Sequence, residues 1–295
     1  MRVLKFGGSS LAGAEKIDLA IDIVRRHMAE DITVAVVSAM AGATDSLLRI
    51  GELAIYRQSI WREKLQEIEG KYAILLNGCA EHWRIAIQRL AANMQRDAES
   101  LQYLHVIAAE EEAARFSGWG ERLMALVFAA RLCSLGIPAY GYPLEPVMLY
   151  GAAQTSDRRA SALATRAWLA PQLASAIRQN AAIVLPGYIA RDPSGKSTTL
   201  GRNASDYSAT LIGAALGATG VYIYSDVAGL YTEDPKVNPQ AQLISYLTFE
   251  EALSVTSRGV KALHPRAVEP AAQSAIPVKL RSLYAPFGAG TDIGA

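Results

Sequence analysis

The feature that most constrains the fold is a set of short apolar runs that alternate with helical patterns. Residues 32–40, ITVAVVSAM, are a continuous β-branched run, which is typical of a strand buried on both faces of a parallel sheet. Residues 2–6 form a similar strand, and the apolar residues from Ile17 to Val24 recur at helical spacing between the two. This order predicts a βαβ unit.

The remainder of the chain continues the alternation. Residues 44–135 are nearly all helical in pattern. Strand character then returns in four short runs, at residues 138–144, 181–189, 220–227 and 276–284. Strands that alternate with helices predict a three-layer αβα sandwich around a mostly parallel sheet. Because the chain has no low-complexity linker, charge block or internal repeat, we expect residues 1–295 to form one domain with two lobes.

The composition limits the possible partners and the compartment. Lys and Arg number 29 against 28 Asp and Glu, a balance that gives no sign of a nucleic-acid or anionic-membrane partner. The two cysteines, Cys79 and Cys133, lie far apart in the sequence and neither is near a second Cys, which favours reduced thiols. No apolar run approaches the roughly 20 residues that span a bilayer. We therefore expect a cytoplasmic protein without a membrane partner.

A glycine turn follows the first strand. Gly7 and Gly8 lie where a strand meets a helix, and backbone N–H groups there can bind an anion, with Lys5 directed at the same charge. The order differs from a P-loop, in which the lysine follows the glycines, and from the dinucleotide fingerprint. A tight turn beside a solvated lysine explains the same residues equally well.

Two further segments place polar residues at strand or helix ends. The second strand ends at Ser38, and Thr44 follows a turn of small residues at the edge where open α/β folds bind ligands. Helix capping by Thr44 or Asp45 is the simpler explanation. Glu121 starts another helical pattern, where the helix dipole favours a carboxylate and a role in stability is the simplest explanation. Binding of a ligand ammonium by Glu121 is the more specific alternative.

The last third of the chain adds three clusters. Arg202, Ser205 and Asp206 lie within five residues between a buried strand and an alanine-rich helix. Residues 224–239 mix hydroxyl, carboxylate and lysine groups that suit a nucleotide, although they also fit a plain turn. Lys261 follows on a helical pattern, where a lone lysine is usually a solvated charge. Together, the clusters predict a site for a phosphate-bearing ligand and a small anionic or zwitterionic one.

These segments resemble the motifs of the aspartate kinases of the amino acid kinase family. The order and spacing of the motifs hold from Lys5 to the end of the chain, and the long TTLGR..SDYSA block is the most specific of them. The matching segments are KFGGSS at 5–10, VSAMAGATD at 37–45, GER at 120–122, TTLGRNASDYSA at 198–209, SDVAGLYTEDPK at 225–236 and GVKALHP at 259–265.

The resemblance implies the amino acid kinase fold and transfer of the γ-phosphoryl of ATP to the β-carboxylate of L-aspartate, with Mg²⁺ carried by ATP. It implies an amino-acid-binding lobe up to about residue 190, an ATP-binding lobe over about 191–295, and a homodimer. Arg202 would bind the α-carboxylate of aspartate and Glu121 its ammonium. The implied catalytic residues are Lys5, Asp206 and Lys261; the substrate-binding residues are Ser38, Thr44, Glu121, Tyr188, Arg202 and Ser205; and the ATP-binding residues are Lys5, Phe6, Gly7, Gly8, Ser225, Asp226, Tyr231, Lys236 and Lys261.

The chemistry of the reaction agrees with this set of residues. A carboxylate nucleophile is already ionised at neutral pH, so the reaction needs no general base, and the sequence offers no catalytic His, Cys or Ser constellation. Phosphoryl transfer instead needs positioning and cations around the transferred group. No metal site made of protein ligands alone is expected.

The sequence also departs from the family pattern. Aspartate kinases usually continue into paired regulatory domains, whereas this sequence stops at Ala295. We therefore expect no feedback inhibition through such domains. Gly118 occupies a position where the family commonly has serine, with Trp119 beside it. Asn203 and Ala204 replace two glycines, and Ala204 is the less expected because alanine tolerates a positive φ poorly.

These departures leave the acceptor acid open. One alternative is a kinase of the same fold acting on a modified aspartate, glutamate or N-acetylglutamate, although Glu121 and Arg202 together favour an acid with a free amine. Another is a catalytically silent partner that binds nucleotide or amino acid, which the presence of Lys5, Asp206 and Lys261 disfavours. A nicotinamide-dependent dehydrogenase is a remote alternative because the dinucleotide fingerprint is missing.

Overall fold

The computed structural model describes most of the chain. The residues that it leaves undescribed are 105–108, 151–158, 202, 234, 236 and 258–262. Three residues that the sequence assigns to the site, Arg202, Lys236 and Lys261, therefore lie outside the described residues.

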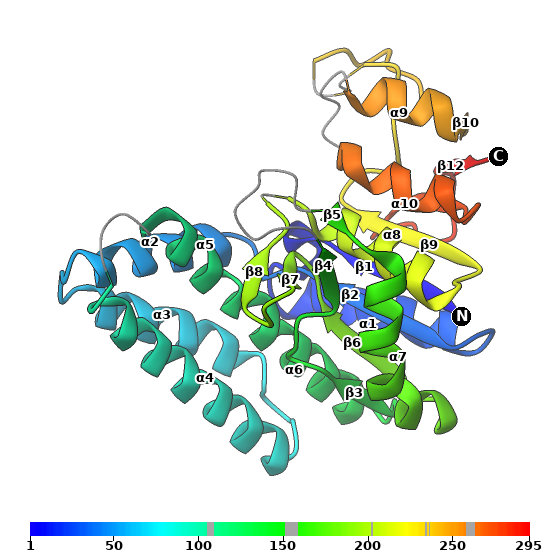
Figure 1. Ribbon diagram of the computed structural model, residues 1–295. Coiled ribbons are helices and arrows are strands. Elements are labelled where there is room, and N and C mark those ends of the chain that lie inside the picture. Colours follow the sequence, from blue (N-terminus) through cyan, green and yellow to red (C-terminus); the bar gives the residue numbers. More distant parts are fainter. Residues whose placement is uncertain (105–108, 151–158, 202, 234, 236, 258–262) are drawn as a thin grey trace.

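In the described part of the chain, eight strands form one twisted sheet in the order β10-β12-β11-β9-β1-β2-β6-β3 (Figure 1). Neighbouring strands are parallel except for the antiparallel pair β11 and β12. The strands are β1 (Arg2–Phe6), β2 (Thr33–Val37), β3 (Ala139–Gly141), β6 (Ala182–Pro186), β9 (Gly220–Ser225), β10 (Tyr246–Thr248), β11 (Val278–Ser282) and β12 (Thr291–Gly294).

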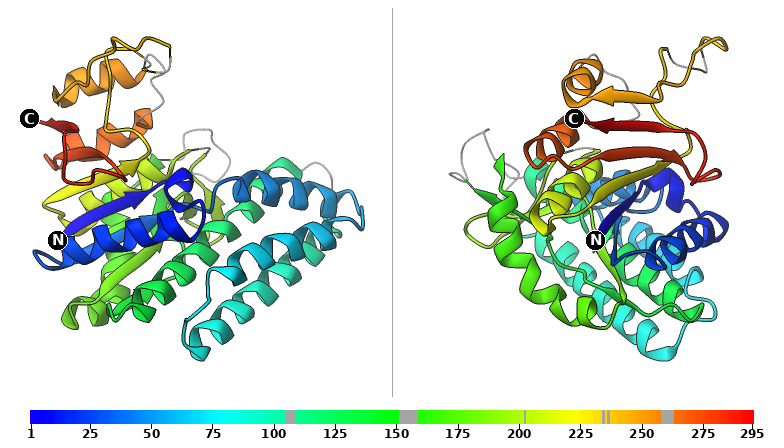
Figure 2. Two further views of the ribbon diagram at one scale, coloured as in Figure 1. Left: turned by 180° about the vertical axis from the view of Figure 1, so that it is seen from behind. Right: turned by 90° about the vertical axis from the view of Figure 1, so that its right-hand side faces the viewer.

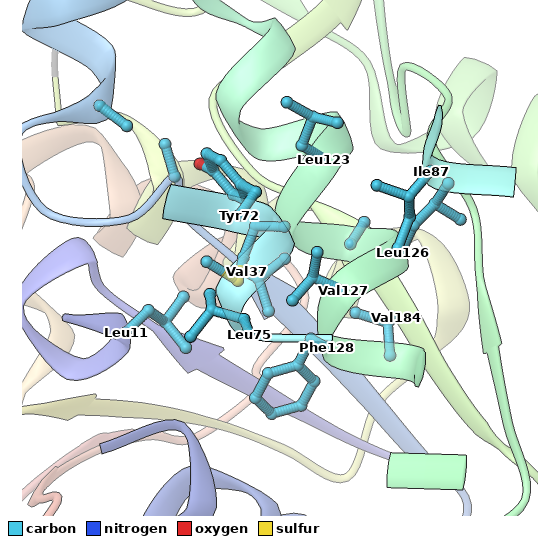
Figure 3. Packing of buried hydrophobic residues seen from close by; sticks show 14 of the residues in the cluster. Leu11, Val37, Tyr72, Leu75, Ile87, Leu123, Leu126, Val127, Phe128 and Val184 are labelled. Carbon is cyan, nitrogen blue, oxygen red and sulfur yellow. The ribbon is translucent and has the colours of Figure 1, made fainter. Parts of the chain in front are cut away.

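Alternate residues of the central strands face two separate cores. Leu4 of β1 and Val37 of β2 face the core beneath α1 (Ala14–Met28) and α6 (Trp119–Ser134), part of which is drawn in Figure 3. Val3 and Val36 face the opposite core, beneath α7 (Ala162–Arg178) and α8 (Ser205–Leu216). Apolar residues on both faces of the strands thus produce the three-layer αβα sandwich that the sequence predicts.

A group of helices projects from one side of the sheet, on the left in Figure 1 and on the right in the rear view of Figure 2. It is made of α2 (Ala43–Ile55), α3 (Trp61–Ile74), α4 (Glu81–Leu101) and α5 (Ala109–Ser117). Its apolar residues, such as Trp61 and Met94, join the core under α6, so this group is continuous with the sandwich.

The described residues also hold a second, smaller sheet that the sequence patterns do not single out, and two short helices near the C-terminal end. This sheet has four strands in the order β5-β4-β7-β8. Its strands are β4 (Val147–Tyr150), β5 (Arg159–Ala160), β7 (Ile189–Arg191) and β8 (Ser197–Thr199), and the C-terminal part adds α9 (Phe249–Ser257) and α10 (Val268–Gln273). Within the described residues, no helix is both long and apolar enough to cross a membrane.

Candidate active site

A cavity of about 1030 Å³ opens where β1, β2 and β9 end. These three strands are neighbours, with β1 in the middle, and Phe6 at the end of β1 is in register with both Val37 and Tyr224. The chain after β1 and the chain after β2 therefore emerge at the same edge of the sheet as the end of β9. Because β1 has later strands on both sides, this edge is a switch point of the sheet, the usual position of ligand sites in open α/β folds.

The glycine turn after β1 forms one wall of the cavity. A Cβ atom on Gly7 would lie 3.1 Å from Lys5 Nζ, and one on Gly8 would lie 3.1 Å from the carbonyl oxygen of Ala39. Both glycines thus let the backbone approach the lysine and the neighbouring loop closely. Both glycines line the cavity, where their backbone N–H groups can bind an anion.

The Lys5 ammonium forms an ion pair with Asp206. Lys5 Nζ lies 2.6 Å from Asp206 Oδ1, and both side chains are nearly buried. The second oxygen of Asp206 accepts a hydrogen bond of 3.1 Å from the backbone N–H of His264. His264 Nδ1 in turn accepts from the N–H of Arg266, so this histidine has a local partner. Asp206 thereby fixes the lysine against the start of α8.

Two serines join the loops on either side of this ion pair. Ser38, just past β2, donates from Oγ to Ser205 Oγ at 2.9 Å, and both residues line the cavity. A Cβ atom on Gly187 would lie 2.9 Å from Ser205 Cβ, so the glycine allows the turn after β6 to pack against α8. The hydroxyl pair sets the distance between the β2 loop and α8.

Glu121 is buried in the first turn of α6, and its carboxylate lines the cavity. Burial raises the pKa of this carboxyl group to about 7, although backbone N–H groups at Ala39 and Glu121 act in the opposite direction. Among the described residues, Glu121 Oε2 has no hydrogen-bond partner. A buried carboxylate oxygen without a partner is costly, and a cation entering the cavity would remove this cost.

Tyr188 closes the cavity between β6 and β7. Its backbone has φ +64°, a conformation that non-glycine residues rarely adopt, and its N–H donates to Ser208 Oγ at 2.9 Å. Its phenol is hydrogen-bonded to Ser117 Oγ at 3.0 Å. These bonds hold a strained backbone in place, which is common at ligand sites.

The segment after β9 lines the opposite end of the cavity. Ser225, Asp226 and Tyr231 all contribute to its wall. Phe6 does not line the cavity, because its ring lies in the core and stacks on the ring of Tyr224, with 5.4 Å between the ring centroids. If Phe6 contacts a nucleotide, as the sequence interpretation supposed, only its backbone could do so.

Thr44 lies inside the first turn of α2 and lines the cavity. The residue at the N-cap position is Gly42, with φ +77° and no side-chain capping bond. Neither Thr44 nor Asp45 therefore occupies the N-cap position that the simpler explanation assigns to one of them. Glycine replaces a capping side chain here because a positive φ is needed.

The sequence matches the amino acid kinase family over residues 1–282. The chain belongs to the amino acid kinase family. It is 34% identical over 300 residues to an aspartokinase of Chlamydia pneumoniae, and this match covers 99% of the chain and 62% of the relative. It is also 34% identical to the lysine-sensitive aspartokinase 3 of Escherichia coli strain K12, with 98% of this chain and 63% of that protein covered.

A solved structure of E. coli aspartokinase III in complex with aspartate and ADP, in the R-state, has the same fold. Its TM-score is 0.86 at 30% sequence identity, and the match covers 100% of this chain and 64% of that one. This amino acid kinase thus spans less than two thirds of the length of these relatives.

The structure explains the glycine that departs from the family pattern. A Cβ atom on Gly118 would overlap the Cγ2 methyl of Ile189. The neighbouring Trp119 does not line the cavity; its Nε1 donates to Asp97 Oδ2 at 2.7 Å. The position of Trp119 therefore does not support the expectation that this residue affects which acid is bound.

The two residues that replace family glycines have different conformations. Asn203 has φ +61°, whereas Ala204 has φ −80°. The concern that alanine must adopt a positive φ is wrong, because the left-handed position is Asn203 and asparagine tolerates it. Asn203 also lines the cavity.

Several cavity residues carry no chemical signal that sequence analysis could isolate. Ala39, Met40 and Ala41 form part of one wall, and Thr232 and Glu233 extend the end that is lined by Ser225, Asp226 and Tyr231. All five lie inside segments already noted for their motifs. Among the described residues, no group of three or more His, Cys, Asp or Glu side chains is arranged to hold a metal ion.

Proposed function

We propose that this amino acid kinase transfers the γ-phosphoryl group of ATP to the β-carboxylate of L-aspartate, giving 4-phospho-L-aspartate. The observation that carries the proposal is one cavity that holds both the buried Glu121 carboxylate and the Lys5–Asp206 ion pair. Glu121 offers a partner for the ammonium of a free amino acid, and Lys5 offers a cation for a transferring phosphoryl group. The similarity to aspartokinases supports the choice of acid.

In this mechanism, the ammonium of aspartate pairs with Glu121 and keeps the Glu121 carboxylate ionised. Ser38, Ser205 and Thr44 line the same cavity as Glu121, and their hydroxyl groups support placing the acceptor carboxylate beside them. That carboxylate is ionised at neutral pH, so one of its oxygens attacks the γ-phosphorus of ATP without a general base, while the bond from this phosphorus to the bridging oxygen breaks and ADP leaves. Arg202, outside the described residues, is proposed to bind the α-carboxylate through two parallel hydrogen bonds.

Lys5 neutralises charge that develops on the phosphoryl oxygens, and Asp206 holds its ammonium at the end of β1. The turn at Gly7 and Gly8 supplies backbone donors. Lys261, outside the described residues, is proposed as the second cation. Fixed cations in a partly enclosed cavity need no reorganisation during the reaction, which is the main source of catalysis in phosphoryl transfer.

We propose that the nucleotide lies at the end of the cavity lined by Ser225, Asp226 and Tyr231, with Lys236 as a further phosphate contact. The Mg²⁺ ion enters as part of the MgATP substrate, since this ion prefers phosphate oxygens and water to a cage of protein ligands. A cytoplasmic homodimer completes the proposal; sedimentation of the purified protein tests the dimer.

The function is tested by incubating the purified protein with ATP, Mg²⁺ and a panel of carboxylic acids. Hydroxylamine traps an acyl phosphate as a hydroxamate, which is coloured with ferric ion. We expect a strong signal with L-aspartate and none with N-acetyl-aspartate, which lacks the ammonium that Glu121 pairs. A strong signal with another acid alone would refute aspartate as the acceptor, and no signal with any acid would refute kinase activity.

A further inference from the structure

Tyr72 is a buried residue of α3 that does not line the cavity, although its hydroxyl reaches two loops that do. Its side chain is 1% exposed and packs in the core under α6, in the same apolar cluster as Leu123 and Val37 (Figure 3). A phenol buried at this depth needs hydrogen-bond partners. Both of its partners are backbone groups next to cavity residues.

The hydroxyl of Tyr72 donates to the carbonyl oxygen of Gly120 at 3.0 Å and accepts from the backbone N–H of Met40 at 3.3 Å. An amide N–H can only donate, so the single phenolic proton is committed to the carbonyl. Burial, together with the charge of Glu121, raises the pKa of Tyr72, so the phenol keeps its proton. The two bonds therefore have fixed directions.

The two backbone groups belong to two adjoining walls of the cavity, the start of α6 and the loop after β2. Gly120 directly precedes Glu121 on α6, and Met40 follows Ser38 and Ala39 in the loop after β2. The walls are in close contact, since a Cβ atom on Gly120 would lie 2.7 Å from Ala39 Cβ. A backbone hydrogen bond from Ala39 to the Glu121 carboxyl also crosses between them.

We propose that Tyr72 is a positioning residue that fixes the Glu121 carboxylate relative to the Ser38–Met40 loop, and thereby sets the affinity for the amino-acid substrate. The inference rests on the proposed function, because it assigns Glu121 to the substrate ammonium. Tyr72 touches neither substrate nor nucleotide. Its effect therefore falls on substrate binding and not on the nucleotide or the transferring phosphoryl group.

The test is the Tyr72→Phe variant, which keeps the ring in the core and removes both hydrogen bonds. We expect the KM for the amino acid to rise about tenfold, as two modest hydrogen bonds suggest, while kcat and the KM for ATP change less than about twofold. Tyr224→Phe is the matched control, since the Tyr224 hydroxyl is also buried but bonds to His27 on α1. We expect the control to lower the melting temperature without raising the KM for the amino acid.

An unchanged KM for the amino acid in Tyr72→Phe, or an equal rise in both KM values, would overturn the inference. So would a rise of the same size in Tyr224→Phe. The assay uses whichever acid the wild-type protein phosphorylates in the hydroxamate panel, so a failure of aspartate as substrate leaves this test intact. If no acid is phosphorylated, the proposed function fails. Calorimetric titration of the wild type and of Tyr72→Phe with aspartate alone then decides the inference, and equal affinities of the two proteins for aspartate would refute it.

If Tyr72→Phe does not fold, hydrogen exchange on the wild-type protein provides the test. The inference requires the Met40 amide to exchange as slowly as the core amides of α3 before any substrate is bound. Exchange of the Met40 amide as fast as that of exposed loop amides would refute a fixed bond to Tyr72.

Discussion

Lys5 Nζ lies 2.6 Å from Asp206 Oδ1, an ion pair that joins the central strand of the sheet to the first turn of α8. The two residues are far apart in sequence and come together because β1 and α8 meet at the switch point of the sheet. Asp206 is held independently by the N–H of His264, so its position does not depend on the lysine. The pair therefore presents a fixed ammonium to the cavity.

Replacing Lys5 by alanine is expected to lower kcat by about 10²- to 10³-fold, the usual effect of removing one group that stabilises transition-state charge. The KM for aspartate should change little, because the ammonium of aspartate is assigned to Glu121. Steady-state kinetics with both substrates varied provide the measurement. Near-normal turnover by Lys5→Ala would show that the lysine has no part in phosphoryl transfer.

The pKa of Glu121, which burial raises to about 7, predicts the pH dependence of substrate affinity. Only the ionised carboxylate can pair with an ammonium, and its fraction falls about tenfold for each pH unit below the pKa. The KM for the amino acid should therefore rise as the pH falls from 8 to 6. A KM that is constant over this range would contradict the role of Glu121.

Glu121→Gln separates the binding role of this residue from its cost to stability. The raised pKa means that the folded protein holds a proton that the unfolded chain releases, so its contribution to stability is lost as the pH rises from about 4.5 to about 7. We expect the variant to melt at a higher temperature than the wild type at pH 8. It should also bind the amino acid more weakly, with a KM that no longer varies with pH.

The layers of the fold could be predicted because the patterns behind them are local. The β-branched runs at β2 and β6 and the helical spacing in α1 identify the sandwich, which the structure confirms. The second sheet could not be predicted in the same way. Its strands β5, β7 and β8 have only two or three residues each, which is too short for any periodicity, and they are strands only because they pair with one another.

The members of the site could be predicted better than their relationships. Lys5, Glu121 and Asp206 stand out as charges next to apolar segments, and the structure brings them to one cavity. Tyr72 could not be found in this way, because it is one aromatic residue in an ordinary amphipathic helix. Its two hydrogen bonds go to backbone groups, which leave no trace in the sequence.

Gly118→Ala is expected to destabilise the protein, because the added methyl group would overlap Ile189 Cγ2. Overpacking of this kind costs about 1–3 kcal/mol, which urea unfolding measures. The cost of Gly118→Ala should be smaller when Ile189 is already alanine, and a double-mutant cycle detects this coupling. Gly70→Ala is the control: Gly70 lies in α3 with open space around it, so this change should stabilise the protein. Equal costs of Gly118→Ala with and without Ile189 would disprove the steric explanation.

The conformations of Asn203 and Ala204 predict opposite responses to glycine. Asn203→Gly should leave the free energy of unfolding nearly unchanged, because glycine adopts φ +61° without strain, whereas Asn203→Ala should lower it by about 1 kcal/mol. Ala204→Gly should be destabilising, since Ala204 is buried with φ −80° and gains nothing from glycine. Urea unfolding of the three variants checks this order. Stabilisation by Ala204→Gly would show that the left-handed conformation has been assigned to the wrong residue of this loop.

Asn203→Gly also tests whether the Asn203 side chain, which lines the cavity, affects the choice of acid. This variant keeps the backbone conformation and removes only the side chain. A change in its relative kcat/KM for aspartate and glutamate would therefore come from the lost amide.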